Sequence, residues 1–325
     1  MDKIIVVGDV FFSNHKDRSF FFNKIKKNFH DYLVIANLEG SIKFDNSKLT
    51  KKAMHMPIPR FKKNEIPDNL IFSLVNNHVT DFGIDNFKLN LDFFGEKAVI
   101  SSHKKISNQI GSKKFIFLAD EKEECILKGT GFLKFSNKEI SRISNEIKSS
   151  IVVIHGGIEF RYFPTPYQRA LARKIIEYGA HKVIFHHSHV IGHHEYWNGC
   201  LIHYGLGNAF FSDIPSIHSL DKSISQAIVC GAKENIKELD LLDPKDMNNV
   251  NSSPEVNKMY HSNYVKFYKK KYKIDSSFRP RQLSIYDTIN IVQFICWIYI
   301  ARLIIRMKFS KKLKIWIDFF LKKNL

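Results

Sequence analysis

The sequence has few cysteines, and they show none of the spacings that cysteine-based sites require. Its 325 residues include four cysteines, which are widely separated and form no CxxC pair. A disulfide scaffold and a zinc finger are therefore excluded, and the pattern is typical of a reducing compartment. The amino terminus lacks a basic segment, a long apolar run and a small-residue cleavage site. We therefore expect MDKIIVVGDV to be a first strand and not a signal peptide.

Acidic residues are also scarce, and the imbalance is concentrated at one end of the chain. The net charge is +18. Residues 261–325 hold 15 basic side chains against 3 acidic ones, whereas residues 1–260 are nearly balanced. A polar segment with two prolines separates these parts. We therefore expect a main domain over 1–242, a linker over 243–258 and a basic helical region over 259–325.

Short apolar runs alternate with stretches of helical spacing along the main domain. This pattern predicts an α/β fold in which strands are buried between helices. The runs that we expect to form strands are residues 3–10, 32–39, 70–77, 114–120, 150–157, 182–189 and 200–208. Between the fifth and sixth runs, Leu171, Ile175 and Tyr178 share one helical face. Gly179 is a natural end for that helix.

Side chains that can bind metals gather at the ends of these runs. Ligands of open α/β sheets collect outside the carboxyl ends of the strands, so we expect these side chains to share one edge. They are Asp9, Glu39, Asn76, Asn77, His78, His155, His186, His187 and His189. Mixed carboxylate, amide and imidazole donors suit Mn, Fe, Zn or Ni, whereas Mg and Ca prefer oxygen alone. The number of donors favours two metals that share a bridging carboxylate.

Five of the fifteen histidines lie in the segment VIFHHSHVIGHHEY, residues 183–196. If the strand continues through this segment, His187 and His189 point to one side, as two ligands of one metal must, and His186 points away. The other histidines, His193 and His194, belong to no motif and are expected to be solvated or packed. Each candidate also has an ordinary alternative, since an isolated polar residue at a strand end is usually a turn or cap residue.

Six segments occur in an order that resembles a known family. They are GDV, NLEG, NNHVTDFG, HGGIEF, PTPYQRALARKIIEYGAHKVIFHHSH and YGLGNAFF. They resemble the bacterial CapA family of capsule and poly-γ-glutamate synthesis proteins, which belongs to the calcineurin-like metallophosphoesterase superfamily. The likeness runs from about residue 3 to residue 211. It implies a four-layer sandwich, in which two facing sheets are flanked by helices.

The resemblance also implies roles for individual residues. The metal ligands would be Asp9, Glu39 as the bridging carboxylate, Asn77, His155, His187 and His189. His78 would face the phosphate in the catalytic site, with Asp81 and Glu159 as supporting or substrate-facing groups. Three motifs differ from the family pattern: the first lacks the histidine of DxH, HGG replaces HWG, and FHHSH replaces GHHPH. We expect the missing histidine to weaken the binding of one metal.

These features predict a hydrolase that uses two divalent metal ions, acts on phosphoesters and serves capsule, surface-polysaccharide or poly-γ-glutamate synthesis. The alternative is a non-catalytic component of a capsule-assembly complex that binds metal and polymer. The expected partners are a phosphorylated or polyanionic substrate, an anionic membrane surface and capsule-assembly proteins, with no nucleic acid. The expected location is cytoplasmic, at the inner face of the membrane.

The carboxyl-terminal region supplies the expected membrane contact. Residues 289–305 are apolar, but Asn290, Gln293 and Arg302 make them marginal as a membrane span. The segment that follows is basic and amphipathic, with an apolar face made of Leu313, Trp316, Ile317 and Phe320. This pattern favours a helix that lies in the surface of an anionic membrane. A helix packed on the main domain or on a partner subunit, and a true span, are the alternatives.

Deletion of residues from 283 onward is expected to abolish binding to membranes, because it removes the basic and aromatic segment. In a vesicle co-sedimentation assay, the full chain should bind anionic vesicles much better than neutral ones. Salt should weaken this binding without abolishing it, because buried apolar area is not screened. A full chain that ignores both kinds of vesicle would contradict the assignment.

Overall fold

The computed structural model describes residues 3–44, 56–120, 129–159, 161, 163–212, 224–230 and 235–240. All of them belong to one compact unit. The linker and the basic helical region that the sequence predicts over 243–325 lie outside the described residues. In the part of the chain that the structure describes, no helix is long and apolar enough to cross a membrane.

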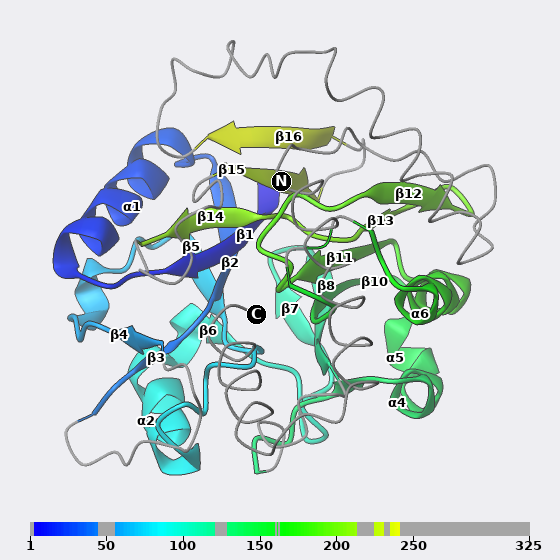
Figure 1. Ribbon diagram of the computed structural model, residues 1–325, viewed down its shortest axis with the longest axis horizontal. Coiled ribbons are helices and arrows are strands. Elements are labelled where there is room, and N and C mark those ends of the chain that lie inside the picture. The colour runs from blue at the N-terminus through cyan, green and yellow to red at the C-terminus, as the bar shows by residue number, and fades with distance from the viewer. Residues whose placement is uncertain are drawn as a thin grey trace, which may run out of the picture. The chain divides into compact units, whose positions relative to one another are not determined.

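The first sheet has seven strands (Figure 1). Its order is β16-β15-β1-β2-β5-β6, and β14 pairs with the carboxyl end of β1. The strands are β1 (Lys3–Phe11), β2 (Tyr32–Leu38), β5 (Leu70–Ser73), β6 (Ala98–Val99), β14 (Asn208–Phe211), β15 (Ile224–Val229) and β16 (Asn235–Asp240). Strands β1, β2 and β5 run parallel, so their carboxyl ends lie at one edge.

The second sheet also has seven strands, in the order β12-β13-β11-β10-β8-β7, and β9 pairs with β8. The strands are β7 (Asn108–Ile110), β8 (Lys113–Asp120), β9 (Lys134–Phe135), β10 (Ser150–His155), β11 (Lys182–His186), β12 (His194–Trp197) and β13 (Cys200–His203). Strands β8, β10 and β11 run parallel at its centre. A small third sheet pairs β3 (Ser41–Ile42) with β4 (Pro57–Ile58).

Helices cover both sheets, and strands of the second sheet are buried on both faces. The α-helices are α1 (His15–Asn28), α2 (Ile84–Phe94), α4 (Asn137–Arg142), α5 (Ser144–Ile147) and α6 (Pro166–Glu177), and the short 3-10 helices are Lys63–Glu65 and Gly95–Lys97. On β8, Phe115 and Phe117 join the core of the first sheet, whereas Ile116 and Leu118 join a core made with α4, α5 and α6. This alternation explains why the strands are nearly continuous apolar runs.

The predicted α/β class is confirmed, and the differences lie at the ends of elements. Helix α6 carries Leu171 and Ile175 inward and stops before Gly179, whose φ of +93° suits a residue without a side chain. The expected strand over 70–77 ends at Ser73, and the chain then passes through the buried Leu74 and Val75 into a turn that begins at Asn76. The expected strand over 200–208 is two separate strands, β13 and β14, in different sheets.

Two buried asparagines of α2 hold the chain that follows Glu39. Asn90 accepts a hydrogen bond from the backbone N–H of Ile42 (2.9 Å) and donates one to its carbonyl (2.9 Å). Asn86 accepts from the backbone N–H of Phe44 (3.0 Å) and donates to the carbonyl of Ile42 (3.0 Å). The side-chain amides of Asn86 and Asn90 thus make the backbone hydrogen bonds that a neighbouring strand would otherwise make. They anchor the segment that follows Glu39 and so help to position its carboxylate.

Asn90→Leu is expected to destabilise the protein by about 1–3 kcal/mol, because it leaves the buried N–H of Ile42 without the Asn90 acceptor and leaves the Ile42 carbonyl with Asn86 alone as its side-chain donor. Denaturant unfolding measures the change in the free energy of unfolding. Asp92→Leu, at an exposed position of the same helix, is the matched control and should change it by about 0.5 kcal/mol or less. Equal effects of the two substitutions would contradict the role of Asn90.

Candidate metal centre

The carboxyl ends of parallel strands from both sheets supply the candidate ligands. In the first sheet, Asp9 of β1 is paired with Asn37 of β2, and Glu39 follows directly after β2. In the second sheet, β10 and β11 end at His155 and His186, which are paired. Sequence-distant side chains therefore meet at strand ends, as expected for this type of sheet.

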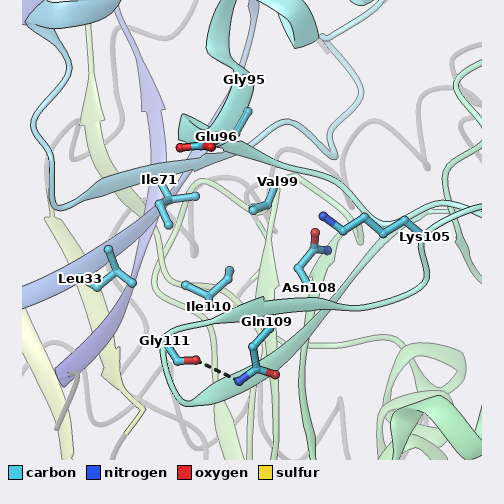
Figure 2. A pocket seen from close by; sticks show the side chains of 11 residues that line it. Leu33, Ile71, Gly95, Glu96, Val99, Lys105, Asn108, Gln109, Ile110 and Gly111 are labelled. Atoms are coloured by element: carbon cyan, nitrogen blue, oxygen red, sulfur yellow. Dashed lines mark hydrogen bonds between the residues drawn. The ribbon is translucent and has the colours of Figure 1, made fainter.

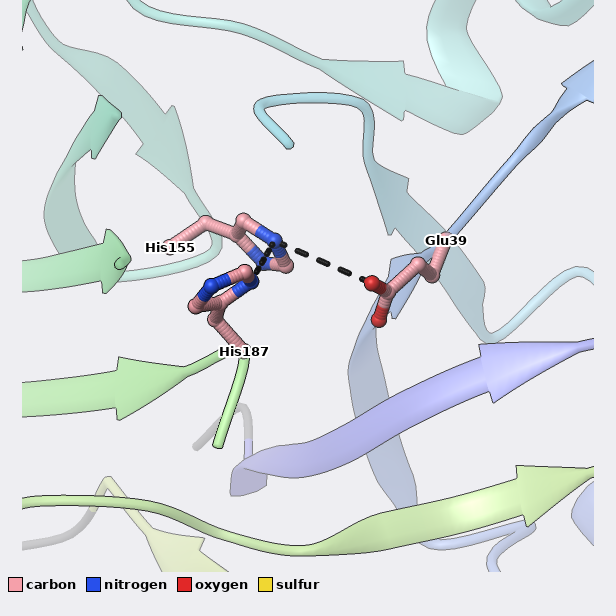
Figure 3. Close-up of side chains that lie close together, drawn as sticks. All are labelled: Glu39, His155 and His187. Atoms are coloured by element: carbon pink, nitrogen blue, oxygen red, sulfur yellow. Dashed lines mark hydrogen bonds and ion pairs between the residues drawn. The ribbon is translucent and has the colours of Figure 1, made fainter. Parts of the chain in front are cut away.

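Glu39 is shared by two groups of buried side chains that could each hold a cation. One group adds His155 and His187, and the other adds Asp9 and His189. The ligand atoms of each group lie within 4.8 Å of one another. Figure 3 shows His155 and His187 turned toward the carboxylate of Glu39. A carboxylate common to two sets of donors is the arrangement in which two metals share a bridging ligand.

Asn77 adds an oxygen donor to the first group. Its Oδ1 lies 2.9 Å from Nε2 of His155. The same nitrogen is 3.2 Å from Nδ1 of His187 and 4.0 Å from Oε1 of Glu39. This set of two imidazoles, one carboxylate and one amide oxygen suits a divalent ion such as Mn, Fe, Zn or Ni.

Asp9 is held as an anion. Its Oδ1 accepts a hydrogen bond from Nδ2 of Asn37 (2.8 Å), and its Oδ2 accepts one from the backbone N–H of His187 (3.0 Å). Nδ1 of His186 lies 3.2 Å from Oδ1. Burial alone raises the pKa of Asp9, but His186 and the other imidazoles outweigh burial and hold this pKa below its ordinary value.

Glu39 is in the opposite situation. Its side chain is buried, and its Oε2 has no hydrogen-bond partner within the described part of the chain. Burial, followed by the charges of Asp9, Glu159 and Asp81, raises the pKa of Glu39 well above its ordinary value. A buried carboxylate crowded by other acids is costly unless a cation or a proton neutralises it. These residues therefore fit divalent metals, and Glu39 is the point where positive charge is needed.

His155 and His187 are in the neutral form that binds metals. Burial and the neighbouring His187 lower the pKa of His155 well below its ordinary value, and burial and His189 lower the pKa of His187. Nδ1 of His189 lies 2.9 Å from Oδ1 of Asn208, which favours the tautomer with a proton on Nδ1. Nε2 of His189 then faces Oε1 of Glu39 at 3.5 Å.

The histidine-rich turn is not a regular strand. Strand β11 ends at His186, and His187 and His189 have positive φ values of 86° and 55°. This left-handed backbone is uncommon for residues other than glycine, and it interrupts the alternation of side chains. The expectation that His186 points away from the site is therefore wrong. Its Nδ1 contacts Asp9, and the turn brings His187 to the same centre.

His78 and Asp81 form a buried pair beside Glu39. Nδ1 of His78 lies 2.7 Å from Oδ2 of Asp81. The backbone N–H of Met56 donates to the same oxygen at 3.0 Å. Nε2 of His78 is 3.9 Å from Oε1 of Glu39. The contact with Asp81 favours a ring proton on Nδ1, and Nε2 faces the centre, which is the geometry that proton exchange with a ligand requires.

Glu159 is exposed, in contrast to the other candidates. Its charge adds to the effect of burial and Asp9 in raising the pKa of Glu39, and it partly offsets the burial that lowers the pKa of His187. Asp120, at the end of β8, also partly offsets the effect of burial on the pKa of His187, and it accepts a hydrogen bond from the backbone N–H of Gly157 (3.0 Å). Our reading of the sequence missed Asp120, although its position at the end of an apolar run was a signal.

His193 and His194 lie outside both candidate groups. The rings of His193 and His194 stack with centroids 5.9 Å apart, and His194 stacks on His203 at 5.7 Å. These imidazoles pack against one another on the hairpin of β12 and β13. The structure thus separates them from His186, His187 and His189 of the same segment.

A pocket of about 460 Å³ lies near the amino ends of β2 and β5, at the strand ends remote from Glu39. Figure 2 shows Leu33, Ile71 and Ile110 turned into it. Its charged lining residues are Glu96 and Lys105. It contains none of the candidate ligands.

The family model described as bacterial capsule synthesis protein PGA_cap matches residues 3–213. The chain belongs to this family. All nine candidate site residues of this PGA_cap protein lie inside the matched region. The resemblance to the CapA family is thereby confirmed.

Curated relatives of this PGA_cap protein carry related names. The PGA biosynthesis protein CapA of Bacillus subtilis (strain 168) is 29% identical over 206 residues, which cover 56% of this chain and 53% of that protein. The capsule biosynthesis protein CapA of Bacillus anthracis is 26% identical over 208 residues, which cover 56% and 50%. The chain thus spans about half the length of these relatives. A crystal structure described as a novel phosphatase from Mycoplasma pneumoniae shares 14% identity and a TM-score of 0.43, covering 75% of this chain and 95% of that one.

Glu39→Gln in this PGA_cap protein is expected to lower metal content and to raise the stability of the metal-stripped protein at pH 7 by about 1–3 kcal/mol. A raised folded-state pKa stabilises the fold below the ordinary value of 4.5, and this stability is lost as pH rises through the folded-state pKa. Glutamine does not ionise, so the variant does not lose this stability as the pH rises. Denaturant unfolding at pH 5 and pH 8, with elemental analysis, measures both effects.

The exposed residue Glu96 provides the control for this prediction. Glu96→Gln should leave both metal content and the pH dependence of unfolding unchanged. If Glu39→Gln retained the metal, or destabilised the stripped protein at pH 8 as much as at pH 5, Glu39 would not be the crowded carboxylate of a metal centre.

Proposed function

We propose that this chain is a metal-dependent hydrolase of phosphoesters that serves capsule or surface-polymer synthesis. The observation that carries the proposal is the buried Glu39 carboxylate, shared by two groups of metal-binding side chains. Membership of the capsule synthesis family supports the biological setting. The buried pair of His78 and Asp81 beside Glu39 supports hydrolysis, because a metal-binding site alone does not require a proton-transfer group.

Two divalent ions, Mn, Fe, Zn or Ni, are the proposed cofactors. When bound, they would supply an activated water and positive charge for the phosphoryl oxygens. Asn77, His155 and His187 would hold one ion with Glu39, and Asp9 and His189 would hold the other.

The protein's own groups then act on the substrate. In its doubly protonated form, His78 is placed to donate the Nε2 proton to the leaving oxygen, and the ring then keeps its Nδ1 proton, which Asp81 accepts in a hydrogen bond that orients the ring. The carboxylates of Asp9 and Glu39 would contact the metal ions and not the phosphate of the substrate. An exposed Glu159 at the rim is suited to contact a hydroxyl or a cation of the substrate rather than its phosphate.

The proposal extends to the setting of the enzyme. The two sheets and their covering helices are proposed to form the four-layer sandwich of metallophosphoesterases. The basic region over 259–325 is proposed to bind an anionic membrane surface from the cytoplasmic side and to bring the site to capsule-assembly proteins. The support for this membrane role is the charge and apolar pattern of the sequence.

A second candidate function is a non-catalytic, metal- and polymer-binding component of capsule assembly. The observation that favours it is the unequal supply of donors to the two groups. Asp9 and His189 join Glu39 on one side, whereas Asn77 adds a fourth residue to the other. A single tightly held ion would stabilise the protein without supporting two-metal hydrolysis.

Asp9→Asn and His187→Ala are expected to lower metal stoichiometry and to abolish hydrolysis of bis-p-nitrophenyl phosphate or p-nitrophenyl phosphate by the Mn-loaded full chain. The reason is that each removes a charge or nitrogen donor from a different group. His193→Ala is the matched control, because this buried histidine lies outside both groups, and it should keep metal and activity. Unchanged metal content in both site variants would overturn the assignment. Full metal content without hydrolysis in the wild type would favour the non-catalytic function.

A further inference from the structure

His186 makes a contact that the proposed function does not use. Its side chain is 2% exposed, and its Nδ1 lies 3.2 Å from Oδ1 of Asp9. Nδ1 has no aligned hydrogen-bond partner within the described residues. A buried polar atom in this position needs a partner, and Asp9 is the acceptor within reach. A small rotation of the ring would direct the N–H along the line to Oδ1.

The sheet register fixes the direction of this side chain. His186 is paired with His155 on the neighbouring parallel strand, and paired residues project from the same face. Because His155 reaches the centre, His186 must also project toward it. The left-handed backbone at His187 then allows the next imidazole to reach the centre as well.

The group of Asp9, Glu39 and His189 has one donor residue fewer than the group that contains Asn77. The affinity of this smaller group for a metal ion therefore depends more on how firmly each ligand is held in place. Two residues after Asp9, the chain carries Phe11, whose ring packs on Phe211 with centroids 5.4 Å apart. His189 also packs on Phe211, with ring centroids 5.1 Å apart. Phe11 occupies the position of the histidine in the DxH motif, so β1 supplies no imidazole next to Asp9. The carboxylate of Asp9 must therefore be oriented by residues of other strands.

We propose that His186 is a positioning residue that orients Asp9 through Nδ1 and thereby sets the affinity of the Asp9, Glu39 and His189 group for a divalent ion. Asn37 acts on the same oxygen from the first sheet, at 2.8 Å, and His186 acts from the second. The carboxylate is held between the two sheets, with Oδ2 fixed by the backbone N–H of His187. A supporting group of this kind typically contributes 10- to 100-fold, roughly, to metal affinity.

This inference rests on the proposed metal centre, and titration of the metal-stripped full chain with Co(II) tests it. Visible absorption follows the geometry around each ion, and equilibrium dialysis gives the stoichiometry. The wild type should bind two equivalents, one more tightly than the other. His186→Leu should weaken the second equivalent by about tenfold or more and leave the first within about threefold.

Two further variants separate hydrogen bonding from packing. His186→Asn places an amide N–H near the position of Nδ1 and should restore the second equivalent, whereas His186→Gln places it farther out and should not. His193→Asn is the matched control, since His193 and His186 are each 3% exposed. It should bind both equivalents like the wild type. The comparison of asparagine with glutamine stays decisive even if His186→Leu fails to fold.

The possible failures are distinguishable. If the wild type binds no Co(II), the proposed function and this inference both fail. If the wild type binds two equivalents and His186→Leu binds them with unchanged affinities, only this inference fails. Equal behaviour of His186→Asn and His186→Gln, or equal weakening of both equivalents in every His186 variant, would likewise assign His186 to packing alone.

Discussion

The burial of the Glu39 carboxylate is the constraint around which the site is arranged. A charge in this position is stabilised by a cation, and the nearby acids Asp9 and Asp81 increase that need. The surrounding imidazoles cannot meet it in the metal-free protein, because burial keeps His155 and His187 neutral. The neutral nitrogen donors and the unsatisfied Glu39 oxygen therefore destabilise the metal-free fold, and binding of a metal ion relieves this destabilisation.

The backbone provides the geometry that this chemistry needs. Parallel strands from two sheets end at the same place, so ligands separated by more than 170 residues, such as Asp9 and His187, come into contact. The left-handed turn after β11 directs several imidazoles to one centre. Asn86 and Asn90 of helix α2 hold the segment beyond Glu39. Each device keeps a polar group in place so that little reorganisation is needed when a ligand binds.

Sequence patterns were sufficient where the local structure was regular. The apolar runs correctly predicted an α/β fold. Side chains from the ends of those runs lie together around Glu39, because parallel strands impose that convergence, and their roles as metal ligands stay predictions. The direction of His186 was predicted wrongly, because simple alternation assumes an extended backbone and His187 has a φ of 86°. Asn37 and Asn208 were missed, because their importance depends on strand register, which pairs both with Asp9. The expectation for residues 243–325 stays a prediction.

Anomalous diffraction from crystals of the full chain grown with Mn(II) tests directly whether Glu39 bridges two metals. Two peaks are expected, about 3.5–4 Å apart, on either side of the Glu39 carboxylate. One should lie within bonding distance of Asp9 and His189, and the other within bonding distance of Asn77, His155 and His187. Peaks that do not contact Glu39, or no bound Mn at millimolar concentration, would contradict a shared-carboxylate metal centre.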